Sequence, residues 1–489
     1  MNKKRILFPK PFAVAIDDMG WMNGSHLGEN GGQGPARAGV DRHFTVSDYQ
    51  VIAEVSKAIG VRLQGLFVLC EMDRENVCAK YPTTTMYGNE WNNDANKSDE
   101  QLEIFAFLKQ NSACIEFGMH GVGHEYWPEK MQLVRAEWYN LFEKKPWPES
   151  ILNNHFKCYR EIMRQYGLSE DEGHSFPESF VSCAYSFYWN PGGDYSLGKL
   201  LNHNGVKYAN TDFSYVRELN PPEGNNGGGF DHGVHVINRI NYGNEYLKYG
   251  SLPEVPVSMQ ESDVVESHFV NWLAAEKSRQ SEITAKWIAF YKNVQGMDNR
   301  YIAKNTEQLH SQWLYNRFTK TEEPKAGEVI IDNSEMPDEA YKYRLLGNMV
   351  LKIKLGHDEH ISYASVDNKQ IAAYFEDAGY AFIYLPPLAK EKYILKYSCG
   401  HRTMDKFIFN KGTYNIYRFD STDYALEFDI KMYGTQNVMI RCPKPASVHS
   451  SNPNLRIISE KYDIAPGFLS LEICARDIIG ETGTVNLTF

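Results

Sequence analysis

The sequence lacks the cysteine spacing of a disulfide-stabilised protein or of a zinc finger. Its eight cysteines form no C-x-x-C pair and no regular framework, which is typical of reduced, buried thiols in a cytoplasmic protein. No apolar run approaches membrane-spanning length. The basic start, MNKKRILFPKPFAVAIDD, has no adequate apolar segment before Asp17, so it predicts a first strand and not a signal peptide. We therefore expect a cytoplasmic protein without a membrane partner.

The sequence also has fewer basic than acidic residues. There are 51 Lys and Arg against 62 Asp and Glu, and the net charge of −11 is spread along the chain, which argues against nucleic acid as a partner. The glycine-rich residues 225–230 lack the Lys and Ser/Thr of a phosphate-binding loop. No G-x-S-x-G nucleophile elbow is present. These absences leave no sequence support for a P-loop nucleotide enzyme or an α/β serine hydrolase.

Short apolar runs instead alternate with segments of helical periodicity over the first half of the chain. A chain of 489 residues exceeds one ordinary core, so two or three domains are expected. Strands are predicted at residues 12–16, 61–70, 113–119, 180–187, 205–211, 233–240 and 263–267, and helices at 45–59, 100–111 and 130–165. This alternation predicts an α/β fold with parallel strands, in which sites form at the carboxyl ends of the strands.

The second half of the chain has a different pattern of apolar and polar residues. Two helical stretches, 269–294 and 300–318, are predicted to close a first domain of residues 1–318. Residues 319–327 (TKTEEPKAG) are polar and contain proline, which is typical of a linker. Residues 328–489 contain short β-rich runs separated by turn residues, which predicts an all-β region of one or two β-sandwich modules.

The stretch IEFGMHGVGHEYW, residues 115–127, holds the most distinctive chemistry. One helical turn, or a tight loop permitted by glycine, would put His120 and His124 on one side, a spacing that suits a divalent metal. Two imidazoles cannot hold the ion alone. The segment FAVAIDD offers Asp17 and Asp18, which point to opposite sides as they leave a strand, so that one can bind the ion and the other act as a base. The alternative is that both simply cap the loop that follows.

AIDDMG followed by HGVGH resembles the polysaccharide deacetylase superfamily, the NodB-like carbohydrate esterases. Members have a strand ending in Asp-Asp and a later H-[S/T]-x-x-H motif, and Gly121 in place of Ser or Thr resembles the divergent bacterial branches. The resemblance covers residues 10–275 and implies a distorted (β/α)7 barrel with a metal ion, usually Zn²⁺, at the strand ends. It implies that Asp18, His120 and His124 are the ligands and that Asp17 is the general base.

Two further segments relate to the same family. DVVESHFVNW resembles its last barrel motif, whose histidine is the general acid, and this implies that role for His268; a structural histidine is the alternative. Residues 181–211 lie where the family has an Arg-Pro-Pro-Tyr-like stretch, but SCAYSFYW lacks both the Arg and the Pro. In the family that Arg orients the catalytic Asp. Either another residue such as Arg74 takes this part, or the substrate and the chemistry have diverged.

The function that the resemblance implies is a zinc-dependent hydrolase that removes an acyl group, in the first instance N-acetyl, from a sugar or glycan. One divalent ion would activate the water, and Asp17 and His268 would act as base and acid. Aromatic and polar residues near the motifs are candidates for sugar binding, although the aromatics could equally fill the core. These substrate-binding candidates are Trp21, Arg74, Glu125, Trp127, Trp189 and Asp212.

Two other functions remain open at this stage. The missing Arg motif and the β-rich half would suit a glycan-binding protein on a catalytically degenerate deacetylase scaffold. Paired carboxylates in a metal-free cleft would instead suit cleavage of a glycosidic bond, although the H-x-x-x-H spacing argues against it. The sequence leaves the oligomeric state open, with a homo-oligomer among the options.

Overall fold

In the computed structural model the chain forms two compact units. The structure describes residues 5–24, 40, 42–130, 132–214, 228–245, 247–256, 263–371, 373–464 and 467–489. The barrel unit comprises Ala13–Ala58 and Leu63–Ile288, and the β-rich unit comprises Met1–Phe12, Ile59–Arg62 and Ala289–Phe489. The expected domain boundary at residue 318 is therefore wrong. The first residues of the chain and residues 289–318 belong with the β-rich half.

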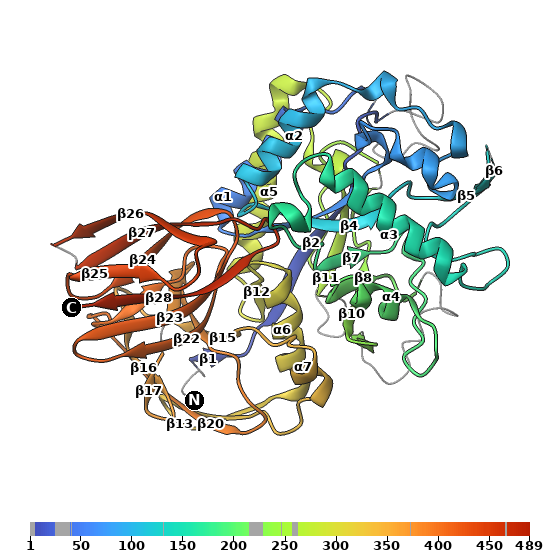
Figure 1. Ribbon diagram of the computed structural model, residues 1–489. Helices are drawn as coiled ribbons and strands as arrows, with labels where there is room; N and C mark the ends of the chain where they lie inside the picture. The colour runs from blue at the N-terminus through green and yellow to red at the C-terminus, as the bar shows by residue number, and fades with distance from the viewer. Residues whose placement is uncertain are drawn as a thin grey trace. The chain divides into compact units, whose positions relative to one another are not determined.

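The barrel unit is built on seven parallel strands that close on themselves (Figure 1). Neighbours along the sheet are β2, β3, β4, β7, β8, β10 and β11, and β11 pairs with β2 to complete the circle. The strands are β2 (Lys10–Met19), β3 (Leu63–Val68), β4 (Ile115–Gly121), β7 (Ser179–Val181), β8 (Tyr208–Thr211), β10 (Val234–Ile240) and β11 (Val264–His268). Every residue of β3, β4, β7, β8 and β11 is buried, as expected for barrel strands covered on both faces.

All seven strands lie within or beside the ranges expected from the apolar runs. The run at 180–187 is the exception in length, because only Ser179–Val181 is a strand. The chain then turns through a 3₁₀ segment, Cys183–Tyr185, in which Ala184 and Tyr185 have left-handed backbone angles of φ 51° and 56°. Two consecutive residues in this conformation lie outside the β region of backbone angles, so the extended strand does not continue through them.

Five helices follow strands of the barrel: α1 (Val46–Ile59), α2 (Asp99–Gln110), α3 (Glu149–Arg164), α4 (Leu197–His203) and α5 (Gln280–Gln295). In the described parts of the chain no helix follows β8 or β10, and β9 (Gly228–Asp231) instead pairs antiparallel with β10. Among the described residues, a helix thus follows five of the seven strands of the closed parallel barrel. The helix expected from residue 130 begins only at Glu149, since the chain before it contains the hairpin β5 (Tyr126–Glu129) and β6 (Gln132–Val134).

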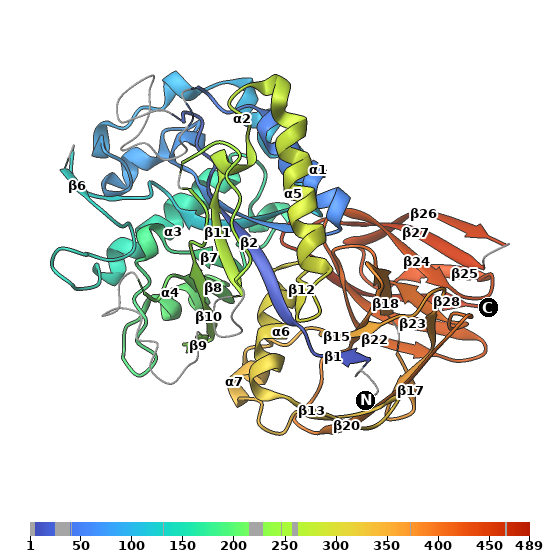
Figure 2. The same ribbon diagram turned by 180° about the vertical axis from the view of Figure 1, so that it is seen from behind.

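The described part of the β-rich unit contains three sheets, two whole helices and one strand, β12 (Arg300–Ile302), that pairs with Lys10–Phe12 (Figure 2). The helices are α6 (Thr306–Phe318) and α7 (Asp338–Lys342). The eight-stranded sheet runs β1 (Ile6–Leu7), β15 (Met349–Lys354), β19 (Tyr380–Leu385), β18 (Ala373–Asp377), β21 (Phe407–Phe409), β24 (Thr435–Arg441), β27 (Phe468–Ala475) and β26 (Leu455–Asp463). The five-stranded sheet runs β13 (Lys320–Lys325), β14 (Glu328–Asp332), β20 (Lys392–Gly400), β16 (His360–Val366) and β17 (Lys369–Gln370). The four-stranded sheet runs β22 (Asn415–Ser421), β23 (Ala425–Met432), β28 (Glu481–Thr488) and β25 (Ser447–Ser450).

The expected β-rich character of residues 328–489 is confirmed, although this region also contains the short helix α7. The expected linker is not confirmed. Residues 320–325 form β13, which pairs antiparallel with β14, so the polar charged sequence is an exposed edge strand and not a free connection. Edge strands commonly carry lysine and proline, which discourage pairing with another chain. The amino-acid composition of residues 319–327 therefore suggested a linker where the protein has a charged edge strand.

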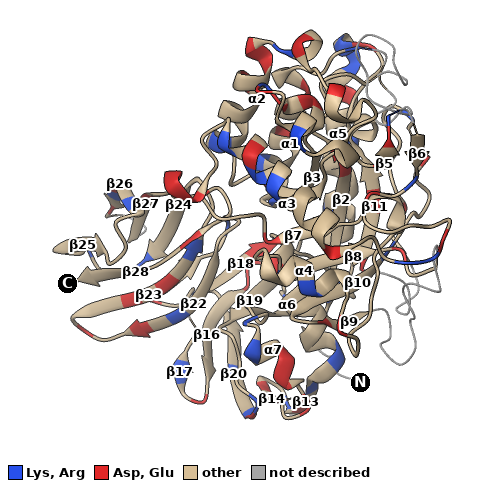
Figure 3. Cartoon of the chain, turned by 45° about the vertical axis from the view of Figure 1, so that its right-hand side comes forward, with Lys and Arg blue, Asp and Glu red and all other residues tan. Residues whose placement is uncertain are grey.

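Among the described residues, basic and acidic positions are both spread over the elements of the two units (Figure 3). This agrees with the distributed net charge of −11. Across the described residues, no helix is both long and apolar enough to cross a membrane.

Candidate metal and acid-base centre

Acidic, basic and imidazole side chains gather where the barrel strands end. Asp17 and Asp18 are among the last residues of β2, and His120 and Arg239 are next to last in β4 and β10. His268 is the last residue of β11. Asp17 and His268 are direct neighbours in the β2–β11 register. All of these residues are at least nine-tenths buried. Parallel strands bring their carboxyl ends to one edge, so residues far apart in sequence meet there.

Asp18 faces both histidines of the HGVGH segment. Its Oδ1 lies 3.7 Å from Nε2 of His120 and 3.7 Å from Nε2 of His124. Ligands bound to a tetrahedral zinc at about 2.0–2.2 Å lie roughly 3.4 Å apart, so the two distances from Asp18 to the histidines are close to those within a ligand set. The residues present thus fit a divalent ion with only a small contraction.

The other ring nitrogen of each histidine is already engaged. His120 Nδ1 is hydrogen-bonded to the carbonyl of Val181 at 2.8 Å, and His124 Nδ1 to Oε1 of Glu125 at 2.7 Å. Such contacts on one nitrogen leave the other available with a fixed ring orientation, as in many metal sites. Burial lowers the pKa of His120 to about 4, so its ring is neutral at pH 7 and has a lone pair to offer.

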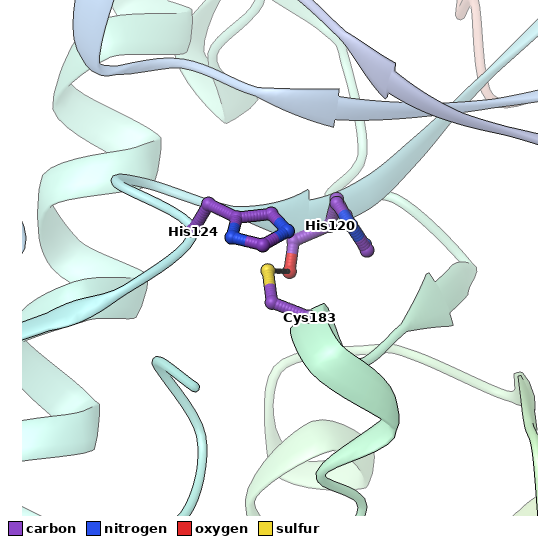
Figure 4. A group of neighbouring side chains, drawn as sticks. All are labelled: His120, His124 and Cys183. Atoms are coloured by element: carbon purple, nitrogen blue, oxygen red, sulfur yellow. Dashed lines mark hydrogen bonds between the residues drawn. The ribbon is translucent and has the colours of Figure 1, made fainter. Parts of the chain in front are cut away.

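A cysteine lies beside the histidines. His120, His124 and Cys183 form a group whose ligand atoms lie within 4.8 Å of one another and could hold a metal ion (Figure 4). The Cys183 thiol donates to the carbonyl of His120 at 3.2 Å, and burial raises its pKa well above the usual value. No sequence pattern indicated Cys183, because its partners are more than fifty residues away.

Asp17 is held by an arginine that the sequence analysis did not select. Arg239 donates from both terminal nitrogens to the two oxygens of Asp17, at 2.9 Å for the Nη1–Oδ1 contact. Burial acts to raise the pKa of Asp17, but the charge and hydrogen bonds of Arg239 outweigh it and hold that pKa far below its usual value. Asp17 is therefore a charged carboxylate with a fixed orientation.

Arg239 also bridges to a second buried acid. Its Nη2 lies 3.4 Å from Oε2 of Glu266, and the hydroxyl of Tyr185 donates to Oε1 of Glu266 at 2.6 Å. Burial raises the pKa of Glu266, with Arg239 opposing that shift. Asp17, Arg239, Glu266 and Tyr185 thus form a continuous chain of polar contacts. A simple criterion would have found Arg239, because it lies one residue before the end of a predicted strand, close to where the other site residues lie in theirs.

Replacing Arg239 by methionine is expected to destabilise the protein by about 3–5 kcal/mol, because two buried carboxylates lose their counter-ion. Urea unfolding followed by circular dichroism would measure this loss. Arg74→Met is the control and is expected to cost less than about 1 kcal/mol. Equal losses in the two variants would contradict the assigned pairing.

His268 completes the group. Its Nε2 lies 3.9 Å from Oδ2 of Asp18, whereas His120 and His124 both face the other carboxylate oxygen, Oδ1. Burial lowers its pKa to about 3, partly offset by Asp17, so the ring is neutral at pH 7 in this state. The expected acid thus lies beside the expected ligand and base.

The backbone around this centre is strained. Asp18 and His124 have φ angles of 61° and 65°, and Ala184 and Tyr185 are also left-handed. Non-glycine residues in such conformations cost about 1–3 kcal/mol each and are concentrated at functional sites. At Asp18 the left-handed turn also replaces the regular strand alternation on which the expected separation of the two carboxylates was based.

The other polar candidates have different positions. Glu125 is in the centre, where it accepts a hydrogen bond from His124. The suggestion that Arg74 orients Asp17 is wrong, because the Arg74 guanidinium binds Gln101 Oε1 at 3.0 Å and the carbonyl of Ser98. Asp212 accepts hydrogen bonds from the backbone and hydroxyl of Ser214 within its own turn.

The aromatic candidates pack in the interior. Trp21 and Trp127 are 1% and 2% exposed, and Trp189, at 8%, packs edge-on against Phe213. A sugar platform needs an exposed ring face, so core packing describes Trp21 and Trp127 better.

Comparison of the chain with known families and with curated proteins gives no match.

Proposed function

We propose that this protein is a metal-dependent hydrolase that removes an acyl group, in the first instance N-acetyl, from a sugar or glycan. The observation that carries the proposal is the pair of 3.7 Å contacts from Asp18 to His120 and His124 at the strand ends of a closed parallel barrel. The proposal includes a (β/α)7 deacetylase-like ancestry for the barrel. It also includes a β-sandwich arrangement for the sheets of the β-rich unit.

Asp18, His120 and His124 would hold one divalent ion, with Zn²⁺ the first choice for two imidazoles and a carboxylate. Such a set leaves coordination positions open for water and substrate. When bound, the ion would lower the pKa of a water molecule toward ~7 and polarise the acyl oxygen.

The remaining roles belong to the chain's own residues. Asp17, kept charged and oriented by Arg239, would accept the proton of the attacking water at a carboxylate oxygen. His268 is neutral at pH 7 in this state, so it would first have to take up a proton from solvent in the substrate complex and then give it to the leaving amine or alcohol. Water adds to the acyl carbon, the bond to the sugar nitrogen or oxygen breaks, and the products are a small acid and a free amine or hydroxyl.

Asp18→Asn and Cys183→Ser are expected to separate the two candidate ligand sets. The carboxylate contacts both Nε2 atoms, whereas the thiol is engaged by the His120 carbonyl. Loss of a ligand's hydrogen-bond partner costs about 10- to 100-fold in metal affinity, and Asp18→Asn, which removes a ligand, is expected to cost more. Cys183→Ser is expected to change the affinity less than about threefold. Zinc titration against a chelating dye measures both, and the reverse order would assign the site to His120, His124 and Cys183.

The activity itself is tested by incubating zinc-loaded protein with a panel of N-acetyl and O-acetyl sugars and assaying released acetate. Release by the wild type and not by Asp17→Asn would support the proposal. The rival is a glycan-binding protein on a degenerate scaffold, favoured by the absence of Arg and Pro from SCAYSFYW. Sugar binding without acetate release from any member of the panel would favour that rival.

A further inference from the structure

A buried carboxylate outside the roles given above supports the segment between the two histidines. Glu137 is completely buried and lies just beyond the β5–β6 hairpin. Its Oε1 accepts the backbone N–H of Val122 at 2.9 Å, and its Oε2 accepts those of Gly123 at 3.2 Å and His124 at 2.9 Å. The backbone N–H groups of three successive residues, the last of which is the proposed ligand His124, thus converge on one side chain. Convergent N–H groups of this kind form a concave anion-binding nest.

The two glycines of HGVGH make this approach possible. A Cβ atom on Gly121 would lie 2.2 Å from Oε2 of Glu137, and one on Gly123 would lie 1.8 Å from the carbonyl oxygen of Thr84. Neither separation is compatible with a side chain, so both positions require glycine for close backbone packing. The close approach of the Glu137 carboxylate therefore explains why residue 121 is a glycine, where the polysaccharide deacetylases usually have Ser or Thr.

Glu137 is itself fixed from three sides. Its Oε1 is bonded to Nδ1 of His155 on α3 at 2.7 Å, and Nε2 of His155 is bonded to Oγ1 of Thr83 at 2.9 Å. Its own backbone N–H donates to the carbonyl of His124 at 3.2 Å. The next residue, Trp138, donates from its indole to the carbonyl of His120 at 2.9 Å. Residues 137 and 138 therefore hold the backbone of both histidines.

We propose that Glu137 is a positioning residue for the metal centre, which holds His124 in its left-handed conformation so that its Nε2 faces Asp18. The inference rests on the metal-binding part of the proposed function and not on deacylation. A carboxylate can satisfy four donors at once, while the glutamine amide would present two hydrogens toward backbone N–H groups. The substitution Glu137→Gln is therefore nearly isosteric but disrupts the nest.

The test compares Glu137→Gln with Asp73→Asn. Asp73 is also completely buried and accepts backbone N–H groups of Glu75 and Cys78 together with the indole of Trp91, but it does not contact the HGVGH segment. Zinc affinity is measured by competition with a chelating dye, the ligand geometry by the visible spectrum of the Co²⁺-loaded protein, and the stability of the metal-free proteins by urea unfolding. Glu137→Gln is expected to lose about 10- to 100-fold in zinc affinity and to change the Co²⁺ spectrum. Asp73→Asn is expected to lose stability without either effect.

Zinc affinity and a Co²⁺ spectrum like those of the wild type in Glu137→Gln would overturn the inference and leave the proposed function standing. A wild type that binds neither ion would overturn both. If Glu137→Gln yields no folded protein, His155→Phe removes one support of Glu137 and keeps an aromatic ring near Tyr126. Weaker zinc binding in that variant supports the inference, and unchanged binding overturns it.

Discussion

Replacing His120 and His124 together by alanine is expected to remove the bound metal and abolish hydrolysis. The wild type should hold about one zinc-like ion per chain after dialysis, and the double variant less than a tenth of that. Asp18 alone cannot hold the ion once the two Nε2 atoms that lie 3.7 Å from it are gone. Because a catalytic ion contributes several kcal/mol of transition-state stabilisation, acetate release should fall by about a thousandfold or more.

The measurement is elemental analysis of purified protein together with the acetate assay. The matched control is His357→Ala/His360→Ala, a second closely spaced histidine pair, which is located in the β-rich unit with side chains 94% and 40% exposed. This control should keep both the ion and the activity. A native protein that takes up no ion from zinc-containing buffer would refute the enzymatic function as proposed.

Asp17→Asn is expected to lower acetate release by about 10²- to 10⁴-fold, the usual contribution of a general base, while the ion stays bound. The substitution keeps the volume of the side chain and one acceptor for Arg239, but it removes the charge that would take up the proton. Asp17 differs in this respect from Asp18, whose replacement should release the ion. Two adjacent carboxylates would then have separable effects.

Steady-state kinetics and metal analysis on the same preparations would measure these effects. Asp212→Asn is the control, because Asp212 is bonded within its own turn and should affect the rate less than about threefold. If Asp17→Asn retained full activity with the ion bound, the base would have to be another residue. Glu266, which shares Arg239 with Asp17, would be the first to examine.

Much of the barrel could be predicted because its strands have a local signal. Residues such as those of β3 and β4 are buried on both faces, so each strand is a short apolar run that can be recognised without knowing its neighbours. The prediction of helix over residues 130–148 was wrong, because the chain there completes the β5–β6 hairpin at Val134 and then forms turns that include the bridge between Asn140 and Lys145. The linker at 319–327 was wrong because a charged edge strand and a free connection have the same composition.

The sequence by itself determined the strands and the pair of motifs, AIDD and HGVGH, that supply the candidate ligands. These are local features, because they depend on the alternation of apolar and polar residues and on glycines at positions where the backbone packs closely. Only the tertiary structure decided that Arg239, 222 residues from Asp17, is the partner of that carboxylate, and that Glu137 lies beneath HGVGH. Contacts of this kind depend on barrel closure between β11 and β2 and on the register of strands far apart in sequence, which the packed core fixes and no local pattern encodes.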